Sequence, residues 1–200
     1  LNVFVGRNGT GKTNLYRALS LLREAAFGRI TRAIAEEGGV ESVLWAGTRR
    51  KGQPVRLELC AWLGDMAYSI AIGLPKLGSD AALPLEPLVK SEKLTLAAGR
   101  RSIVLMERAG PTATLRAADG TRATFANELL GSETALFAFR DGARFPELDI
   151  VRRALADWRF HHGFRTDRDA ALRRPALALT TPTLAPDGSD LAAVFATLSE

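Results

Sequence analysis

A glycine-rich segment close to the start of the chain constrains the fold more than any other feature. Residues 6–13 read Gly-Arg-Asn-Gly-Thr-Gly-Lys-Thr and match the pattern G-x-x-x-x-G-K-[ST] at every defined position. The segment Leu1–Val5 before it is short and apolar, which predicts a buried strand. Apolar residues then recur at helical spacing, at Leu15, Leu19, Leu22 and Ala26. A strand, a glycine loop and a helix in this order predict an α/β fold with the loop at the helix N-terminus.

The residue types in this loop suit the binding of a phosphate chain and a magnesium ion. Glycines at positions 6, 9 and 11 allow backbone conformations and close approaches that a Cβ atom would prevent. The helix N-terminus carries partial positive charge, which favours an anion. The Lys12 ammonium can reach β- and γ-phosphate oxygens, and the Thr13 hydroxyl can ligate Mg²⁺.

We therefore predict a site for ATP and Mg²⁺, with Lys12 as the catalytic residue and Thr13 as the metal ligand. The predicted nucleotide-binding residues are Gly6, Arg7, Asn8, Gly9, Thr10, Gly11, Lys12, Thr13 and Asn14. One alternative is a glycine-rich turn that holds an incidental lysine. Another is a dinucleotide site, but the pattern G-x-G-x-x-G is absent and such a site has no use for the Lys-Thr pair.

The middle of the chain, residues 51–126, predicts an antiparallel sheet. Val55–Leu63 alternates apolar and polar residues, and further β-rich runs follow at Ala67–Leu74, Leu94–Ala97, Ile103–Arg108, Ala113–Ala117 and Thr121–Phe125. Asp119-Gly120 is typical of a two-residue hairpin turn between the last two. Before the sheet, residues 1–50 hold the loop, the long helix and a second predicted helix over Ile30–Glu37 that ends at two glycines.

Residues 127–200 predict a mixture of helices and loops. Helices are expected over Ser132–Phe139, Pro146–Trp158 and Asp190–Leu198, the last capped by Ser189 or Asp187. Residues 159–164 are expected to be extended, and residues 167–186 to form a loop. We expect all three parts to belong to one partial ATPase domain, residues 1–200.

Composition limits the remaining possibilities. The net charge of +5 is compatible with nucleic-acid contact without indicating it. The single cysteine, Cys60, is expected to be a buried structural thiol, and the adjacent His161 and His162 to be ordinary strand-end residues rather than metal ligands. We find neither a membrane span nor a secretory signal, so a cytoplasmic location is expected. The tryptophans are expected in packing roles, at Trp45, Trp62 and Trp158.

The string from Asn2 to Leu15 resembles the phosphate loop of ATPases with an ABC-type head, specifically the predicted AAA-family ATPases related to the RecF, SMC and OLD proteins. Asn8 and Asn14-Leu15 distinguish this group from many other phosphate-loop families. Later stretches are also similar to that group, at Gly38-Gly39, Leu44-Trp45, Tyr68-Ser69-Ile70, Trp158-Arg159-Phe160, Leu172-Arg173-Arg174-Pro175 and Leu184–Ala192. The resemblance implies a P-loop NTPase core of α/β class with an inserted antiparallel subdomain, and a homodimer that holds ATP between its heads.

The chain departs from the complete pattern of that family. A strand that ends in Asp-Glu is missing; Ile103–Glu107 is the nearest candidate, and an ordinary strand explains it better. No Leu-Ser-Gly-Gly-like signature is present, helix capping explains Ala185–Asp190, and Gln53 is the only glutamine. The resemblance therefore implies that the C-terminal part of the core lies beyond residue 200. We expect this chain to bind ATP without efficient turnover, and a general base is not identified.

The expected function is ATP binding, with hydrolysis in the full-length protein driving a conformational or dimerisation switch. One alternative is an ATP-gated DNA-binding module in DNA repair or phage defence, which would bind DNA in a salt-sensitive way. Another is a small-molecule P-loop kinase, against which the long antiparallel middle argues.

Overall fold

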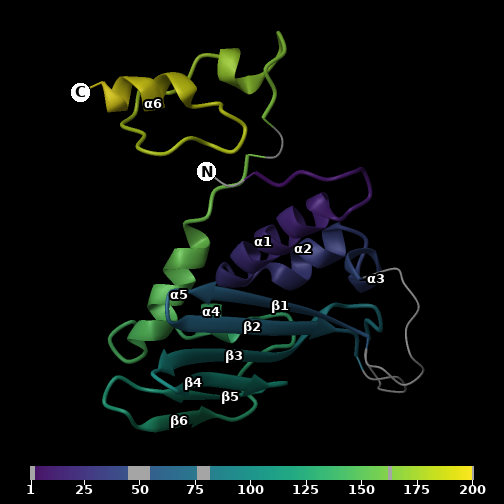
Figure 1. The fold of residues 1–200 in the computed structure, drawn as a ribbon, viewed down its shortest axis with the longest axis vertical. Coiled ribbons are helices and arrows are strands. Elements are labelled where there is room, and N and C mark those ends of the chain that lie inside the picture. The colour runs from purple at the N-terminus through teal and green to yellow at the C-terminus, as the bar shows by residue number, and fades with distance from the viewer. Residues whose placement is uncertain (1–2, 45–54, 76–81, 162–163, 200) are drawn as a thin grey trace. The chain divides into compact units, whose positions relative to one another are not determined.

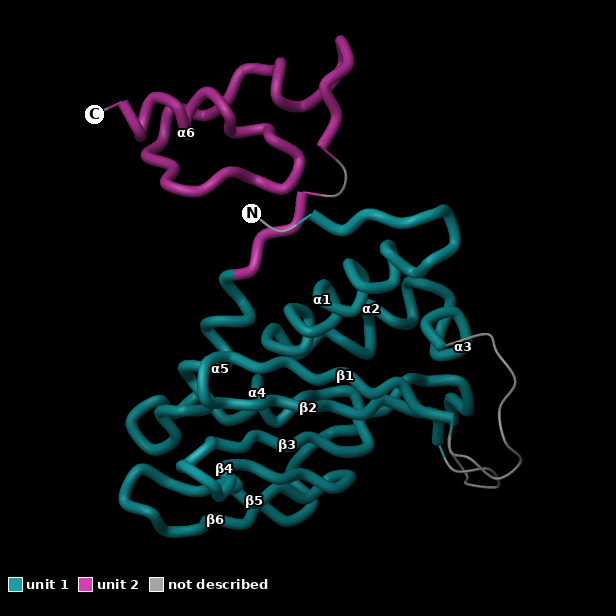
Figure 2. Tube along the Cα trace, viewed as in Figure 1, with its two compact units in different colours: residues 1–157 teal, residues 158–200 magenta. Residues whose placement is uncertain are grey.

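The computed structural model describes residues 3–44, 55–75, 82–161 and 164–199. Its chain forms two compact units, residues 1–157 and residues 158–200 (Figure 2). In the part of the chain that the structure describes, none of the helices is both long and apolar enough to pass through a membrane.

The first unit is built on a six-stranded sheet in which every strand pairs antiparallel with its neighbour in the sequence (Figure 1). The strands are β1 (Arg56–Leu63), β2 (Met66–Gly73), β3 (Leu88–Ala98), β4 (Arg101–Ala109), β5 (Thr112–Arg116) and β6 (Arg122–Phe125). The antiparallel sheet expected within residues 51–126 is thus present. Its last hairpin contains Asp119-Gly120 as predicted, but the connection is longer than two residues and closes where the Ala117 N–H donates to Thr121 O at 2.8 Å.

One face of the sheet carries the core. Register places Leu59 opposite Ile70 and Tyr68 opposite Leu94, and all four are buried. Helix α1 contacts β1, and α5 contacts β4. The two-residue period of the strands therefore separates this apolar face from the other, more exposed face, to which Arg56, Glu58, Cys60 and Trp62 of β1 belong.

Among the described residues of this unit, five helices accompany the sheet: α1 (Lys12–Ala26), α2 (Ile30–Glu36), α3 (Val40–Val43), α4 (Ala135–Ala138) and α5 (Pro146–Ala156). The helices predicted from Lys12, over Ile30–Glu37 and from Pro146 are confirmed. Gly28 follows the end of α1 with φ 69°, a left-handed conformation that commonly ends a helix. Helix α4 is shorter than the predicted Ser132–Phe139, and its N-cap is Thr134.

The predicted strand Leu1–Val5 is not formed in its described part. Residues 3–5 have no regular structure, and their side chains are 73%, 70% and 91% exposed. A strand needs a neighbour to satisfy its backbone groups, and each described strand pairs only with strands of the meander. The apolar composition of residues 3–5 predicts a buried strand, but none of the described strands pairs with these residues.

Two side chains on the sheet also differ from expectation. Cys60 is exposed, not buried, and Trp62 is 75% exposed. Both lie on the strand face opposite to Leu59 and Ala61, which are buried. The alternation of β1 was recognisable in the sequence. Which face of the strand becomes buried depends on where the helices pack, and the alternation does not predict that. Trp45, Gln53 and His162 lie outside the described residues.

The second unit holds a short 3-10 helix, η1 (Ala171–Arg173), and α6 (Leu191–Leu198). The described residues of 159–164 are not in a strand, so the expected extended segment is not part of a sheet. Trp158 is half-buried. The helix predicted over Asp190–Leu198 is present, but its N-cap is Asp190, whose carboxylate accepts from the Ala185 N–H at 2.8 Å.

Candidate phosphate-binding loop

The loop before α1 depends on glycine at three positions. Gly9 and Gly11 have φ of 85° and 90°, a region that residues with a Cβ atom rarely adopt. A Cβ atom on Gly6 would lie 2.9 Å from Thr10 Oγ1. That hydroxyl donates to Arg7 O at 2.9 Å, so the loop turns back on itself within four residues. The three glycines therefore allow the backbone conformations and the close approach that this turn requires.

Lys12 folds back over this turn. Its Nζ donates to Gly6 O at 2.5 Å and to Arg7 O at 2.8 Å. The ammonium is therefore positioned by the loop backbone rather than by a carboxylate. A cation held in this way can interact with an anion that the loop receives.

The helix that starts at Lys12 adds a second source of positive potential. Its first turn contains no acidic residue, and Gly11 O accepts from the Leu15 N–H at 3.1 Å as the ladder begins. The N–H groups before Leu15 have no acceptor within the helix, since the first turn of any helix lacks them. Thr13 and Asn14 lie in this turn and are exposed. The loop therefore offers backbone donors, an ammonium and a hydroxyl together.

The other sequence candidates lie in different local surroundings. Glu107, the last residue of the candidate strand Ile103–Glu107, lies in β4 of the antiparallel sheet and pairs with Lys93 at 3.7 Å on its exposed face. Asp187 accepts from the Ser189 N–H at 3.1 Å in the turn before α6, in the second unit. His161 is exposed, 6.3 Å from the Phe164 ring. Among the described residues, no three His, Cys, Asp or Glu side chains gather as a metal site would require.

A pocket of about 250 Å³ lies beside the first turn of α1. It is lined by Asn14, Arg17, Ala18, Leu21, Ser42, Val43, Leu44, Leu57 and Leu59. The sequence does not reveal it, because its walls come from α1, α3 and β1 and depend on how these elements pack. Only Asn14 was among the predicted binding residues.

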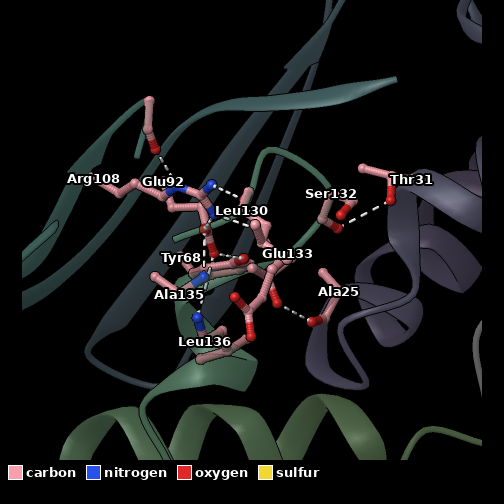
Figure 3. A network of polar contacts seen from close by, with 12 residues as sticks. Ala25, Thr31, Tyr68, Glu92, Arg108, Leu130, Ser132, Glu133, Ala135 and Leu136 are labelled. Carbon is pink, nitrogen blue, oxygen red and sulfur yellow. Dashed lines mark hydrogen bonds and ion pairs between the residues drawn. The ribbon is translucent and has the colours of Figure 1, made fainter. Parts of the chain in front are cut away.

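The sequence also did not reveal a polar network beneath the helices (Figure 3). Arg108 and Glu92 form an ion pair of 2.9 Å, and neither side chain is exposed. Tyr68 Oη donates to Glu92 at 2.8 Å. Burial, followed by the nearby Glu92 charge, raises the pKa of Tyr68 well above its usual value.

The network extends to the C-terminal end of α1, the end of that helix that lies away from the phosphate loop. Glu92 accepts from the Ala135 N–H at 2.6 Å, at the start of α4. The preceding residue, Thr134, donates through its hydroxyl to Ala25 O in the last turn of α1, at 2.8 Å. Thr31 of α2 donates to Ser132 O at 3.0 Å. The loop helix is thereby hydrogen-bonded to the segment that the buried ion pair holds.

A comparison with models of known protein families gives a match over the part of the chain that contains the loop. Residues 1–59 match the model of a family described as "AAA domain, putative AbiEii toxin, Type IV TA system". No curated protein and no solved structure matches the chain. The match supports a P-loop AAA-type ATPase domain at the start of the chain, a class that in general binds and hydrolyses ATP with Mg²⁺. The six-stranded antiparallel sheet that follows makes the chain α/β.

Proposed function

We propose that this chain binds Mg-ATP through residues 6–14. The position of Lys12 carries the proposal: its ammonium lies against Gly6 O and Arg7 O, within the loop that the motif defines. There it neutralises charge on the β- and γ-phosphates, while loop amides receive the phosphate oxygens. Thr13, the next residue, supplies an oxygen ligand for Mg²⁺.

We further propose that ATP binding and hydrolysis by this protein drive a conformational or dimerisation switch. The family match supports the ATPase class, and the resemblance of residues 2–15 to ABC-type heads supports the switch. Helix α1 accepts a hydrogen bond from Thr134, and the next residue, Ala135, donates to Glu92 of β3, which gives nucleotide binding a route from the loop helix to the sheet. Light scattering of the protein tests the dimer, which is expected with Mg-ATP and not with Mg-ADP.

Stabilisation by ligand tests binding in this chain. A ligand at 100 times its dissociation constant adds about 2.7 kcal/mol to the free energy of unfolding. We expect Mg-ATP to raise the urea midpoint of the wild type and not that of Lys12→Ala. Lys93→Ala, which removes an exposed lysine from β3, is the matched control and should respond as the wild type does. Equal responses of all three proteins would refute the role of Lys12.

Magnesium dependence tests Thr13 separately. With EDTA, ATP should stabilise the wild type less than Mg-ATP does. In Thr13→Val the difference between the two conditions should become small, because the hydroxyl ligand is lost while the side-chain shape is kept. An unchanged magnesium response in this variant would remove Thr13 from the metal site.

A further inference from the structure

The tip of the loop before α1 places an asparagine directly before a glycine. The Thr10 hydroxyl donates to Arg7 O at 2.9 Å and the Thr10 N–H donates to the same oxygen at 3.4 Å, so the turn closes around Asn8 and Gly9. Both residues at the tip are exposed. No other asparagine of the chain precedes a glycine. The loop therefore carries a dipeptide with a chemistry of its own.

An asparagine followed by glycine can react without an enzyme, and asparagine is among the thermally labile residues. The Gly9 backbone nitrogen loses its proton and attacks Cγ of the Asn8 side chain. The new N–Cγ bond forms, the Cγ–Nδ2 bond breaks, and the departing nitrogen takes a proton from water and leaves as ammonia. Water then opens the cyclic imide at either of its carbonyls, which leaves an aspartyl or an isoaspartyl residue at position 8. The sum is one water consumed and one ammonia released, with no change of oxidation state.

Three features of the loop favour this reaction at Asn8. Gly9 has no side chain to shield its nitrogen, and a Cβ atom built on it would have nothing within 4 Å. Among the described residues, neither the Asn8 side chain nor the Gly9 N–H takes part in a hydrogen bond. Ring closure also requires rotation of the backbone between the two residues, and glycine restricts that rotation less than any other residue. The attacking nitrogen and the amide are thus both free to meet.

We propose that Asn8 is a site of spontaneous deamidation, and that the product inactivates the phosphate loop. The second part rests on the proposed function. The Lys12 ammonium donates to Arg7 O at 2.8 Å, and a carboxylate on the next residue would compete with phosphate oxygens for that cation. The isoaspartyl product also lengthens the backbone by one carbon atom before Gly9, which displaces the loop amides from the positions that a phosphate chain needs.

A bound nucleotide should protect the site. Loop amides that donate to phosphate oxygens are held in place, and a Gly9 nitrogen engaged in this way is no longer free to attack Asn8. The empty protein would therefore lose its nucleotide site with time, whereas the loaded protein would keep it.

Peptide mapping by mass spectrometry follows the reaction in the whole chain, incubated in mildly alkaline buffer with and without Mg-ATP. Asn127 is the internal control, because it is also exposed and outside helices and strands, but the side chain of Glu128 hinders attack by the following nitrogen. Asn8→Gln is the matched variant, since a glutamine must close a larger and less favourable ring. Calorimetry measures Mg-ATP binding before and after incubation, and circular dichroism checks that each sample is folded.

We expect Asn8 to deamidate about tenfold faster than Asn127, which corresponds to a barrier lower by about 1.4 kcal/mol. Mg-ATP at about ten times its dissociation constant should slow the reaction at Asn8 by about tenfold, because only the free fraction reacts. The incubated wild type should lose Mg-ATP binding in proportion to the fraction modified at Asn8. The variant Asn8→Gln should keep the affinity that it had before incubation.

The outcomes separate the modification from the proposed function. Deamidation of Asn8 that is no faster than that of Asn127 would overturn the modification site. Full Mg-ATP binding by the deamidated chain, or equal rates with and without bound Mg-ATP, would overturn its effect on the loop. If the fresh, folded wild type binds no Mg-ATP, the proposed function fails, and the comparison of Asn8 with Asn127 still decides the modification site.

Discussion

Arg108 and Glu92 face each other across β3 and β4, paired at 2.9 Å with both side chains fully buried. Every part of the pair has further partners. Arg108 donates to the carbonyls of Gly110, Leu130 and Glu133, and Glu92 accepts from the Tyr68 hydroxyl and the Ala135 N–H. Buried charges persist only when paired and hydrogen-bonded in this way. The pair thereby fixes the segment after the sheet to the sheet itself.

Breaking this pair should cost much stability. Glu92→Gln leaves the Arg108 charge buried without a counter-charge, which costs about 3–5 kcal/mol. The matched control is Glu107→Gln on the exposed face of the same strands, where the pair with Lys93 is worth at most about 1 kcal/mol. Urea denaturation of the three proteins measures both changes. Similar losses in the two variants would contradict the account of the network.

Tyr68 should make stability depend on pH in the alkaline range. Burial raises the pKa of Tyr68 in the folded protein, so the folded state keeps a proton that the unfolded chain releases above about pH 10. The stabilisation is therefore complete below about pH 10 and falls as pH rises further, by up to about 1.4 kcal/mol per pH unit. Tyr68→Phe should flatten this decline relative to the wild type. Urea midpoints measured between pH 8 and 11 test this. Equal declines with pH in the wild type and in Tyr68→Phe would contradict the prediction.

Gly28 should tolerate substitution less well than Gly64. Both have left-handed φ, 69° and 60°, which costs a residue with a Cβ atom about 1–2 kcal/mol. A Cβ atom on Gly28 would also lie 2.6 Å from the Phe137 ring, whereas nothing lies within 4 Å of one on Gly64. Gly28→Ala should thus lose about 1–3 kcal/mol more than Gly64→Ala in thermal or urea unfolding. Equal losses would show that the Phe137 contact is not close.

Cys60 should react in the folded protein. It is exposed on β1, and partial desolvation raises the pKa of its thiol. Because the thiolate is the reacting form, we expect a thiol-specific disulfide reagent to label one group per chain without denaturant, more slowly than it labels a free cysteine. Cys60→Ser should give no labelling, since the chain has no other cysteine. Labelling that begins only in urea would mean that the thiol is buried after all.

The sequence predicted the helices, strands and turns whose conformation depends on residues a few positions apart in the chain. The helix from Lys12 was readable from apolar spacing and the strands from alternation, and the Gly9 and Gly11 conformations follow from the motif. These features depend on residues a few positions apart. The amino-acid sequence alone was therefore sufficient to locate the glycine loop and the helix that follows it, whereas phosphate binding by this loop stays a prediction.

Features that depend on distant residues were not predictable in the same way. The burial of Glu92 and Arg108 requires Ala135 and the carbonyls near it, more than 20 residues away from either side chain. The pocket beside Asn14 requires α3 and β1 to meet α1. For residues 3–5, apolar composition suggested a strand, but a strand forms only where a partner strand lies alongside.

The most direct test of the central proposal is a calorimetric titration of Mg-ATP into the wild-type chain and into Lys12→Ala. The loop predicts saturable binding by the wild type that the variant loses, because the ammonium held over Gly6 and Arg7 is removed. Circular dichroism should show that both chains are folded. Binding that is equally strong in folded Lys12→Ala, or absent from the folded wild type, would contradict the proposal that residues 6–14 hold the phosphates of ATP.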